Sequence, residues 1–507
     1  MHNIRLNRVY SSLMIDVVVI GGGLLGASTA RDAALRGLSV ALFESDDFGA
    51  GATSHGARVL GAGLRALETL DFTRVREQLH EREVLLQIAS SLVVPLPCLI
   101  PFYDSNLLVQ ARLRASLALT DALGFDKSLP LHQILSAGEA REREPSLSAR
   151  GLGGAALVWE ASVPSPARLA LEVALDAQAQ GASLYTHIRV DGLRHRPAER
   201  QRESVEGVRW TNLLTGEQGE TPAALIINTT GASLPNVDRQ VKGLAGVPSM
   251  RRKCVSVALP ALRGGRDALL FPGEGDGGLR FAVPCLGLSL LGTLETDLID
   301  QSPEGLYATG SEVAALMHPL REYLPEADWE HPTLALAALR ISPPFPGPPA
   351  LPDTSLSLVI DHAASGDGLG GLISAAGGSL LSCRSQAEEV VDLACRKLGR
   401  ALSTPSCRTA VLPLSIGAHS TPNITFHDES ALAAAVQYSV KYEQCHTLND
   451  FLIRRSSRFW LLDQGRSSVP AVLGQMAALL DWDPSRQATE VKAWEAEAAL
   501  SQAFRVL

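Results

Sequence analysis

The segment that most constrains this fold is a glycine-rich turn between an apolar strand and a helix. The run Val17-Val18-Val19-Ile20 is apolar and β-branched throughout, which is typical of a buried parallel strand. The turn Gly21-Gly22-Gly23-Leu24-Leu25-Gly26 follows. A helix-forming run over Ala27–Arg36 then ends at Gly37, and a second strand is predicted over Ser39–Phe43. This order of strand, turn, helix and strand indicates a doubly wound α/β domain.

The spacing of the glycines predicts a dinucleotide site. Gly21, Gly23 and Gly26 form a G-x-G-x-x-G pattern, in which the first glycine makes the tight turn, the second lets pyrophosphate approach, and the third allows close helix–strand packing. The N-terminus of the following helix offers free N–H groups to phosphate. Glu44 ends the second strand roughly 20 residues later, where a carboxylate accepts hydrogen bonds from ribose hydroxyls.

A second apparent glycine motif, Gly366-Asp367-Gly368-Leu369-Gly370-Gly371, is rejected as a dinucleotide site. The predicted strand Leu372–Ala376 follows it, so no helix N-terminus would face a phosphate. The chain is therefore expected to bind one dinucleotide. This disfavours enzymes that pass electrons from NAD(P)H to FAD.

Three further small-residue turns favour FAD over NAD. The loop 49–54 can lay backbone amides and hydroxyls along a pyrophosphate, and two later strands end in glycine, one of them before a helix predicted over Ser385–Leu398. Each turn alone is unremarkable, but their order and spacing together indicate FAD. The cofactor-binding residues expected from these turns, beside the first glycine motif and Glu44, are Gly51, Thr53, Ser54, Gly231, Gly377 and Gly378.

Composition limits the class of protein. The chain has 507 residues, of which 46% are hydrophobic and 20% charged, so it can bury more than one core and is not disordered. Its net charge of −9 and the lack of a long basic run argue against nucleic-acid binding. Its seven cysteines include no C-x-x-C pair, so no metal site is expected. No secretory signal or membrane-spanning segment is recognised, and a cytoplasmic location is expected.

The pattern along the chain predicts two regions. Residues 14–400 would form an FAD-dependent oxidoreductase region, and residues 405–507 a C-terminal helical domain. Within the first, residues 65–122 look mostly helical, with Pro95, Pro97 and Pro101 breaking the helices, and residues 253–297 look like an antiparallel sheet. The proline-rich run 341–352 is expected to be an extended loop. The predicted C-terminal helices are Glu429–Tyr442, Leu448–Leu462 and Val469–Trp482.

Several of these segments together resemble the FAD-dependent glycerol-3-phosphate dehydrogenases. They are DVVVIGGGLLGASTARDAALRGLSVALFESDDFGAGATS, GLRALETLDFTRVREQLHEREVLL, LLTGEQGETPAALIINTTGAS and DHAASGDGLGGLISAAGGSLLSCRSQAEEVVDLACRKLG, and the C-terminal stretch Ala434–Leu462 is similar as well. The resemblance implies an α/β fold: a Rossmann-like FAD-binding domain interleaved with an antiparallel-sheet substrate domain, plus a small C-terminal helical domain. It also implies hydride transfer from glycerol 3-phosphate to flavin, giving dihydroxyacetone phosphate.

The chain departs from this family at several pocket positions, so it is interpreted as a divergent member. The family's His-Gly-Gly-Leu-Arg run reads Gly61-Ala62-Gly63-Leu64-Arg65 here, and its Gly-Gly-Lys-Leu-Thr-Thr-Tyr-Arg run reads Gly377-Gly378-Ser379-Leu380-Leu381-Ser382-Cys383-Arg384. The histidine, lysine and tyrosine are missing. Pro284-Cys285 stands where the family has Pro-Trp, and Gly292-Thr293-Leu294-Glu295 where it has Gly-Thr-Thr-Asp. No residue of the sequence is identified as the proton acceptor.

Three basic residues that match the family's pattern are the candidate catalytic residues. Arg340 ends the strand Leu336–Arg340 and is expected to bind the anionic group of the substrate, with help from Lys253 or Arg65. His55 lies beside the pyrophosphate loop and is interpreted as a solvent or ribityl contact rather than a base. The expected partners are a small anionic substrate and a quinone or other electron acceptor, met in the cytoplasm or at the inner face of the membrane. Whether the chain forms a homodimer is left open.

Two alternatives remain open at this point. One is an amino-acid or hydroxy-acid oxidase of the same fold, in which Arg340 would hold a carboxylate. The other is a flavin-binding subunit that has lost turnover, which the missing histidine, lysine and tyrosine favour. Two charged clusters are not assigned to the site: His80-Glu81-Arg82-Glu83 is predicted to be a solvated helix face, and Arg454, Arg455 and Arg458 are interpreted as domain-packing residues rather than as contacts to anionic lipid.

Overall fold

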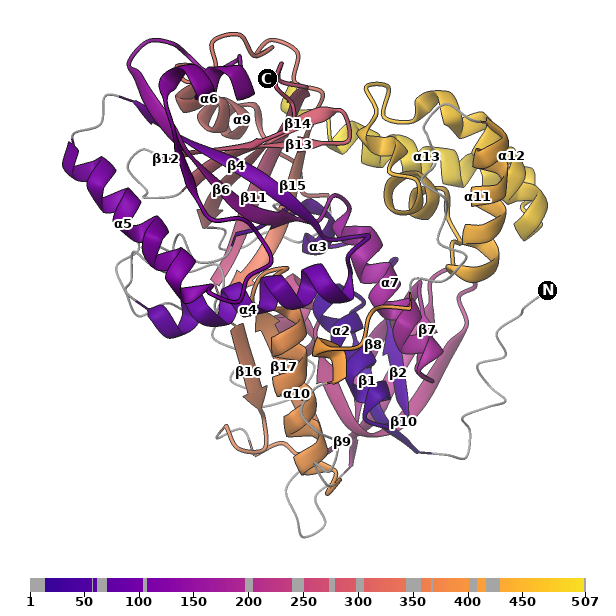
Figure 1. The fold of residues 1–507 in the computed structure, drawn as a ribbon. Helices are drawn as coiled ribbons and strands as arrows, with labels where there is room; N and C mark the ends of the chain where they lie inside the picture. Colours follow the sequence, from indigo (N-terminus) through magenta and orange to yellow (C-terminus); the bar gives the residue numbers. More distant parts are fainter. Residues whose placement is uncertain are drawn as a thin grey trace.

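The computed structural model contains two β-sheets with helices packed on them and a separate group of C-terminal helices (Figure 1). It describes residues 14–56, 58–61, 71–103, 107–196, 204–238, 250–272, 279–297, 305–342, 357–365, 368–400, 408–415 and 429–505. Arg65 and most of the proline-rich run 341–352 lie outside these residues.

The first sheet is built around the predicted buried strand. Strand β1 (Ile15–Ile20) pairs in parallel with β2 on one side and β10 on the other, so the strand order reverses direction at β1. Such a reversal opens a crevice at the carboxyl ends of the strands. The sheet order is β16-β17-β10-β1-β2-β7, with β2 at Val40–Phe43, β7 at Ser183–Tyr185, β10 at Gln218–Asn228, β16 at Ser357–Asp361 and β17 at Leu372–Gly377.

Both faces of this sheet are covered, which explains why β1 is apolar at every position. Val17 and Val19 face a helical layer made of α2, α7 and α10, whereas Val18 and Ile20 face the hairpin of β8 and β9. The hairpin continues antiparallel into the first half of β10. The bounds are α2 Leu24–Leu35, α7 Pro166–Ala179, α10 Cys383–Lys397, β8 Ile188–Arg196 and β9 Ser204–Asn212.

The second sheet is mostly antiparallel, as expected for the substrate domain. Its order is β15-β11-β14-β13-β12-β4-β6-β3, and β5 pairs with β6. Helices α6 and α9 pack on one face, and α5 lies beside β4 on the other (Figure 1). The bounds are β3 Val59–Leu60, β4 Val94–Tyr103, β5 Gln133–Leu135, β6 Leu152–Ser162, β11 Met250–Pro260, β12 Ala268–Pro272, β13 Leu279–Cys285, β14 Leu288–Asp297, β15 Leu334–Ser342, α4 Phe72–Ile88, α5 Leu107–Leu123, α6 Ala137–Arg143 and α9 Gly310–Met317. The two sheets take their strands alternately along the chain, so the predicted interleaved fold is confirmed.

One expectation about the second sheet is wrong. Pro95, Pro97 and Pro101 do not break helices but lie within strand β4. The three prolines are separated by even numbers of residues, so the N–H groups that they lack all belong to one edge of the strand. The strand keeps a long antiparallel pairing with β6, whereas β12 pairs with it only at Cys98 and Leu99. The three prolines are tolerated because they lie outside the two residues of β4 that pair with β12.

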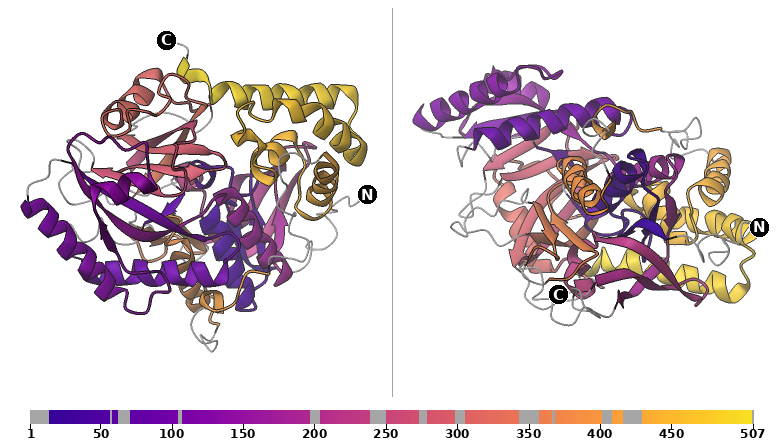
Figure 2. Two further views of the ribbon diagram at one scale, coloured as in Figure 1. Left: turned by 45° about the horizontal axis from the view of Figure 1, so that its top comes forward. Right: turned by 90° about the horizontal axis from the view of Figure 1, so that it is seen from below.

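The C-terminal helices form their own apolar cluster and dock on the second sheet (Figure 2). The predicted helix Leu448–Leu462 is instead a short π-helix, Asp450–Arg455, followed by a 3₁₀ turn at Arg458–Trp460. Ser457 between them has a left-handed backbone (φ 53°), which ends the helix. The other helices are α11 Glu429–Tyr442, α12 Val469–Leu480 and α13 Pro484–Leu500, the last of which the sequence pattern did not predict. No helix in the described ranges is long and apolar enough to cross a bilayer.

The charged cluster on α4 is also a correction. Only His80 of the four residues is exposed, and the predicted solvated face is buried against other elements. Glu81 pairs with Arg384 of α10 at 2.5 Å, and Arg82 pairs with Glu160 of β6 at 2.8 Å. These charged side chains are buried because they form ion pairs across the contacts of α4 with α10 and with β6.

Candidate functional site

The glycine turn after β1 leaves no room for a side chain at Gly21 or at Gly26. Gly21 has a left-handed backbone (φ 104°), and a Cβ added there would lie 2.8 Å from the carbonyl oxygen of Thr229. A Cβ on Gly26 would lie 1.8 Å from the carbonyl oxygen of Gly21. Helix α2 can therefore approach the strand only with glycine at position 26, as a dinucleotide turn requires.

The N-terminus of α2 is open to an anion. Gly23 caps this helix and has no side chain to bond the first-turn N–H groups, and the first turn contains no acidic residue. The N–H of Leu24 donates to Thr53 Oγ1 at 3.2 Å, which places the Thr53 hydroxyl at the helix start. The N–H groups of a helix start, its positive dipole end and a nearby hydroxyl fit a pyrophosphate group.

Glu44 is held at the end of β2 beside this turn. Its Oε2 accepts the N–H of Gly22 at 2.6 Å, and its Oε1 accepts the N–H of Asp46 at 2.8 Å. Burial raises the pKa of Glu44, and the two N–H groups only partly offset this effect. The carboxylate lies at the strand end, where the ribose of a dinucleotide fits.

The loop after Glu44 folds back onto the turn and reaches the second sheet. Gly49 N–H donates to the carbonyl of Gly22 at 3.0 Å, and the Ser54 hydroxyl donates to the carbonyl of Gly49. The short helix α3 (Ala52–His55) then packs against β15. His55 is half-buried, and its Nδ1 lies 3.0 Å from the carbonyl oxygen of Gly51.

The glycines at the ends of β10 and β17 lie at the same edge of the first sheet. Thr229 Oγ1 donates to the carbonyl of Ile20 at 2.8 Å, which ties the end of β10 to the end of β1. Gly231, Gly377 and Gly378 all have left-handed backbones, with φ between 55° and 75°. Strand β15 contacts both the 3₁₀ turn at Gly231–Ser233 and β17, so the second sheet meets the first at this edge.

Arg340 lies at this junction. Its Nη2 donates to the carbonyl of Gly378 at 3.1 Å, and its Nη1 donates to Glu295 Oε1 at 3.3 Å. Glu295 also accepts from Arg252 at 3.1 Å, so its carboxylate lies between two guanidinium groups. The Arg340 side chain remains 29% exposed, which leaves it accessible to a small anion.

The structure does not bring Lys253 to Arg340. Arg252 is opposite Arg340 in the pairing of β11 with β15, whereas Lys253 is opposite Leu339. Because neighbouring residues of a strand point to opposite faces, Lys253 lies on the far side of the sheet. There its Nζ pairs with Glu312 of α9 at 2.7 Å.

Sequence reasoning missed two features of this region. Glu295 was noted as a departure from the family pattern but not as a partner of Arg340, since only strand register reveals that pairing. Asp47 was not singled out, yet it is fully buried and pairs with Arg454 and Arg455. The interpretation of these two arginines as domain-packing residues is confirmed. The described residues contain no group of three or more His, Cys, Asp or Glu placed to hold a metal ion.

Comparison with known proteins agrees with this geometry. Residues 16–383 match the family described as FAD dependent oxidoreductase, and residues 408–487 match the C-terminal domain of alpha-glycerophosphate oxidase. A glycerol-3-phosphate dehydrogenase of Synechocystis is 35% identical over 80% of this chain and 74% of its own length.

Solved structures share the fold. A glycerol-3-phosphate dehydrogenase from Bacillus halodurans, solved as a complex with FAD, superimposes with a TM-score of 0.75 at 21% identity over 97% of this chain and 96% of its own. A glycine oxidase from Geobacillus kaustophilus superimposes with a TM-score of 0.56 at 22% identity, over 76% of this chain and 95% of its own. Both structures therefore share the fold of this chain.

Proposed function

Because this chain belongs to the family of FAD-dependent glycerol-3-phosphate dehydrogenases, we propose that it oxidises glycerol 3-phosphate or a closely related small anionic alcohol. It is an FAD-dependent oxidoreductase, and the glycine turn, the open start of α2 and the Glu44 carboxylate fit that cofactor. FAD supplies the acceptor for a hydride from the substrate carbon. The observation that carries the proposed substrate is Arg340, a partly exposed guanidinium where β15 meets the glycine-ended strands.

In this proposal Arg340 binds and orients the substrate anion. A guanidinium can hold a phosphate through two parallel hydrogen bonds, and this fixes which carbon of the alcohol faces the cofactor. Glu295 already accepts from Arg340, so an incoming phosphate competes with or displaces this carboxylate. Arg65, which lies outside the described residues, is proposed as a second anion-binding residue on the basis of the family pattern.

Electron transfer out of the enzyme requires an acceptor. We propose that the acceptor is a quinone or a similar compound. We also propose that this chain is a cytoplasmic protein that meets the acceptor at the inner face of the membrane, and that it forms a homodimer. This part of the proposal rests on the resemblance to the family. Activity with a soluble quinone analogue, compared with activity under oxygen alone, tests it: turnover with oxygen and none with the quinone would contradict the proposal.

The Arg340–Glu295 pair also supports a second candidate substrate class. A guanidinium beside a carboxylate matches the two charges of an amino acid, because the arginine can hold the carboxylate while the glutamate accepts from the ammonium group. Amino-acid oxidation is therefore the alternative that a specific contact favours. A flavin-binding subunit without turnover is the remaining candidate.

An anaerobic absorbance titration of the holoenzyme separates these candidates. Glycerol 3-phosphate, D-lactate and several amino acids would be added in turn while the absorption of oxidised flavin is followed. Rapid loss of this absorption with glycerol 3-phosphate alone is the expected result. Loss with an amino acid instead would establish the second class, and no loss with any compound would favour a subunit without turnover.

A further inference from the structure

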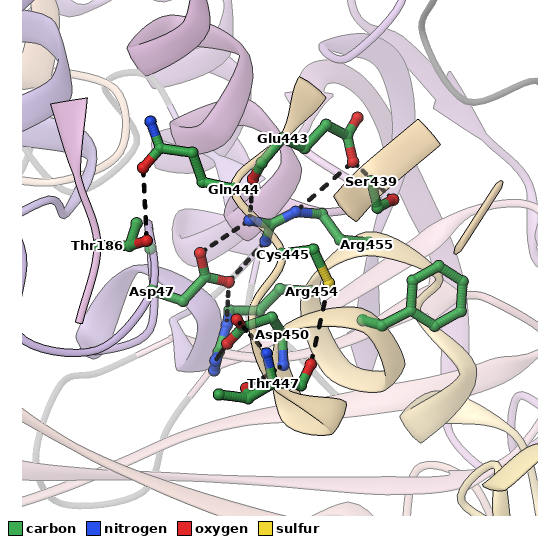
Figure 3. A network of polar contacts seen from close by, with 12 residues as sticks. Asp47, Thr186, Ser439, Glu443, Gln444, Cys445, Thr447, Asp450, Arg454 and Arg455 are labelled. Atoms are coloured by element: carbon green, nitrogen blue, oxygen red, sulfur yellow. Dashed lines mark hydrogen bonds and ion pairs between the residues drawn. The ribbon is translucent and has the colours of Figure 1, made fainter. Parts of the chain in front are cut away.

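The C-terminal helices hold the loop that follows Glu44 through a buried carboxylate (Figure 3). Asp47 has no exposed side-chain surface, and neither has Arg455. Arg455 donates to both Asp47 oxygens, from Nη1 at 2.6 Å and from Nη2 at 2.8 Å, and Arg454 Nε donates to Oδ2 at 2.6 Å. A two-pronged arginine–carboxylate contact of this kind fixes both position and orientation.

A second contact holds the same loop through its backbone. The N–H of His187 donates to the carbonyl of Asp46 at 2.8 Å, so the loop backbone rests on His187. The His187 ring lies 3.0 Å from Asp450 through Nε2. Asp450 in turn accepts the N–H groups of His446 and Thr447 at 2.8 and 2.9 Å. The π-helix Asp450–Arg455 therefore contacts the loop directly through Arg454 and Arg455, and its first residue, Asp450, reaches the loop by way of His187.

The held loop supports the dinucleotide turn directly. The N–H of Asp46 donates to Glu44 at 2.8 Å, and Gly49 donates to the carbonyl of Gly22 at 3.0 Å. Phe48 packs on Gly22 so closely that a Cβ there would lie 2.7 Å from the Phe48 ring. A shift of Asp47 would therefore move residues on both sides of it that touch Glu44 and Gly22.

We propose that Arg454 and Arg455 of the C-terminal domain are positioning residues for FAD, which hold the Glu44–Gly49 loop in the geometry that binds the adenosine half of the cofactor. They act through Asp47 and do not touch the cofactor. Binding coupling is reciprocal, so FAD also stabilises the docked C-terminal helices. This inference goes beyond the proposed function and depends only on FAD binding, so it stands whichever substrate the enzyme uses.

The test compares two buried arginines that lie three residues apart. Arg455→Gln removes the contact to Asp47, whereas Arg458→Gln removes a buried guanidinium that bonds to Ser468 within the C-terminal domain. Each full-length variant is stripped of FAD, and its affinity for FAD and for ADP is measured by titration. We expect Arg455→Gln to weaken both ligands by about tenfold, within the usual range of site-to-site coupling, and Arg458→Gln to change neither by more than about twofold. Arg455→Lys should restore part of the affinity.

The outcomes that contradict the proposal are specific. Equal losses in Arg455→Gln and Arg458→Gln would show a general folding effect, and unchanged ADP affinity in Arg455→Gln would show that the loop does not transmit the contact. If Arg455→Gln does not fold, hydrogen exchange on the natural apoprotein decides. ADP should then slow exchange across residues 450–455, and unchanged exchange there would overturn the proposal.

Discussion

The guanidinium of Arg340 lies 3.3 Å from the carboxylate of Glu295, so the proposed anion-binding residue already has a negatively charged neighbour. Glu295→Gln removes this charge and keeps the side-chain shape. If the substrate is a phosphate, we expect KM to fall roughly fivefold, because an ion pair at a partly exposed site contributes about 1 kcal/mol. If the substrate is an amino acid, KM should rise instead. Steady-state kinetics of the variant with glycerol 3-phosphate and with amino acids distinguish the two.

Arg340→Met tests the anion contact itself. Loss of a charge-assisted hydrogen bond costs about 2 kcal/mol, so we expect kcat/KM for the anionic substrate to fall by a factor of roughly 30. The FAD content of the variant is measured as well, because Arg340 also donates to the carbonyl of Gly378, an expected cofactor-binding residue. Lys253→Met is the control: Lys253 faces Glu312 on the opposite side of that sheet, and its loss should not alter KM. A KM effect of Lys253→Met as large as that of Arg340→Met would contradict this assignment.

The glycine turn makes a steric prediction. In Gly26→Ala a Cβ would lie 1.8 Å from the carbonyl oxygen of Gly21, so α2 must move away from the strand and FAD binding should be lost. Gly474 in α12 has nothing within 4 Å of an added Cβ, so Gly474→Ala should stabilise the protein by up to about 1 kcal/mol. Flavin content of the purified variants and their thermal unfolding check both expectations. A Gly26→Ala protein with full flavin would refute the steric account.

The His187–Asp450 pair predicts a pH dependence of stability. Burial favours the neutral ring, but the carboxylates of Asp450, Asp46 and Asp47 outweigh it and raise the pKa of His187 above its ordinary value. A raised pKa means that protonated His187 stabilises the fold below about pH 6.5, the unfolded value, and that this stabilisation is lost as pH rises through the folded pKa.

His187→Gln checks this sign. The difference in unfolding free energy between the natural protein and the variant should be largest at or below about pH 6 and should shrink toward pH 9. His446 contributes in the opposite direction, since burial lowers its pKa, so the comparison is repeated in a His446→Gln background. A difference that grows with pH in both backgrounds would rule out the ion pair as its origin.

The cysteines of the described residues should be inert in the folded protein. All six are buried and unpaired, and burial raises the pKa of Cys254 and of Cys383 to about 12. Since the thiolate is the reactive form, iodoacetamide at neutral pH should modify none of them until the protein is unfolded. Mass spectrometry of the labelled protein identifies the sites, and rapid native labelling of Cys383 would contradict the burial.

Much of the first domain could be predicted from local sequence. The strand, turn and helix around Gly21–Gly26 follow from backbone and packing requirements of single residues, and Glu44 follows from its distance along the chain. The α4 cluster Glu81–Glu83 and the prolines of β4 were interpreted wrongly for the same reason. Both are decided by neighbours that are distant in sequence, namely Arg384 and Glu160 for the charges and β6 for the prolines.

The sequence by itself determined that the chain binds a dinucleotide and that its relatives are FAD-dependent dehydrogenases, because glycine spacing and residue order need no knowledge of distant contacts. Only the tertiary structure decided which basic residues share a site. Strand register sends Arg340 and Lys253 to opposite faces, since a shift of one residue reverses the direction of a side chain. The tertiary structure also pairs Asp47 with Arg455, 408 residues away, because a buried carboxylate is stable only where a folded chain brings it an opposite charge.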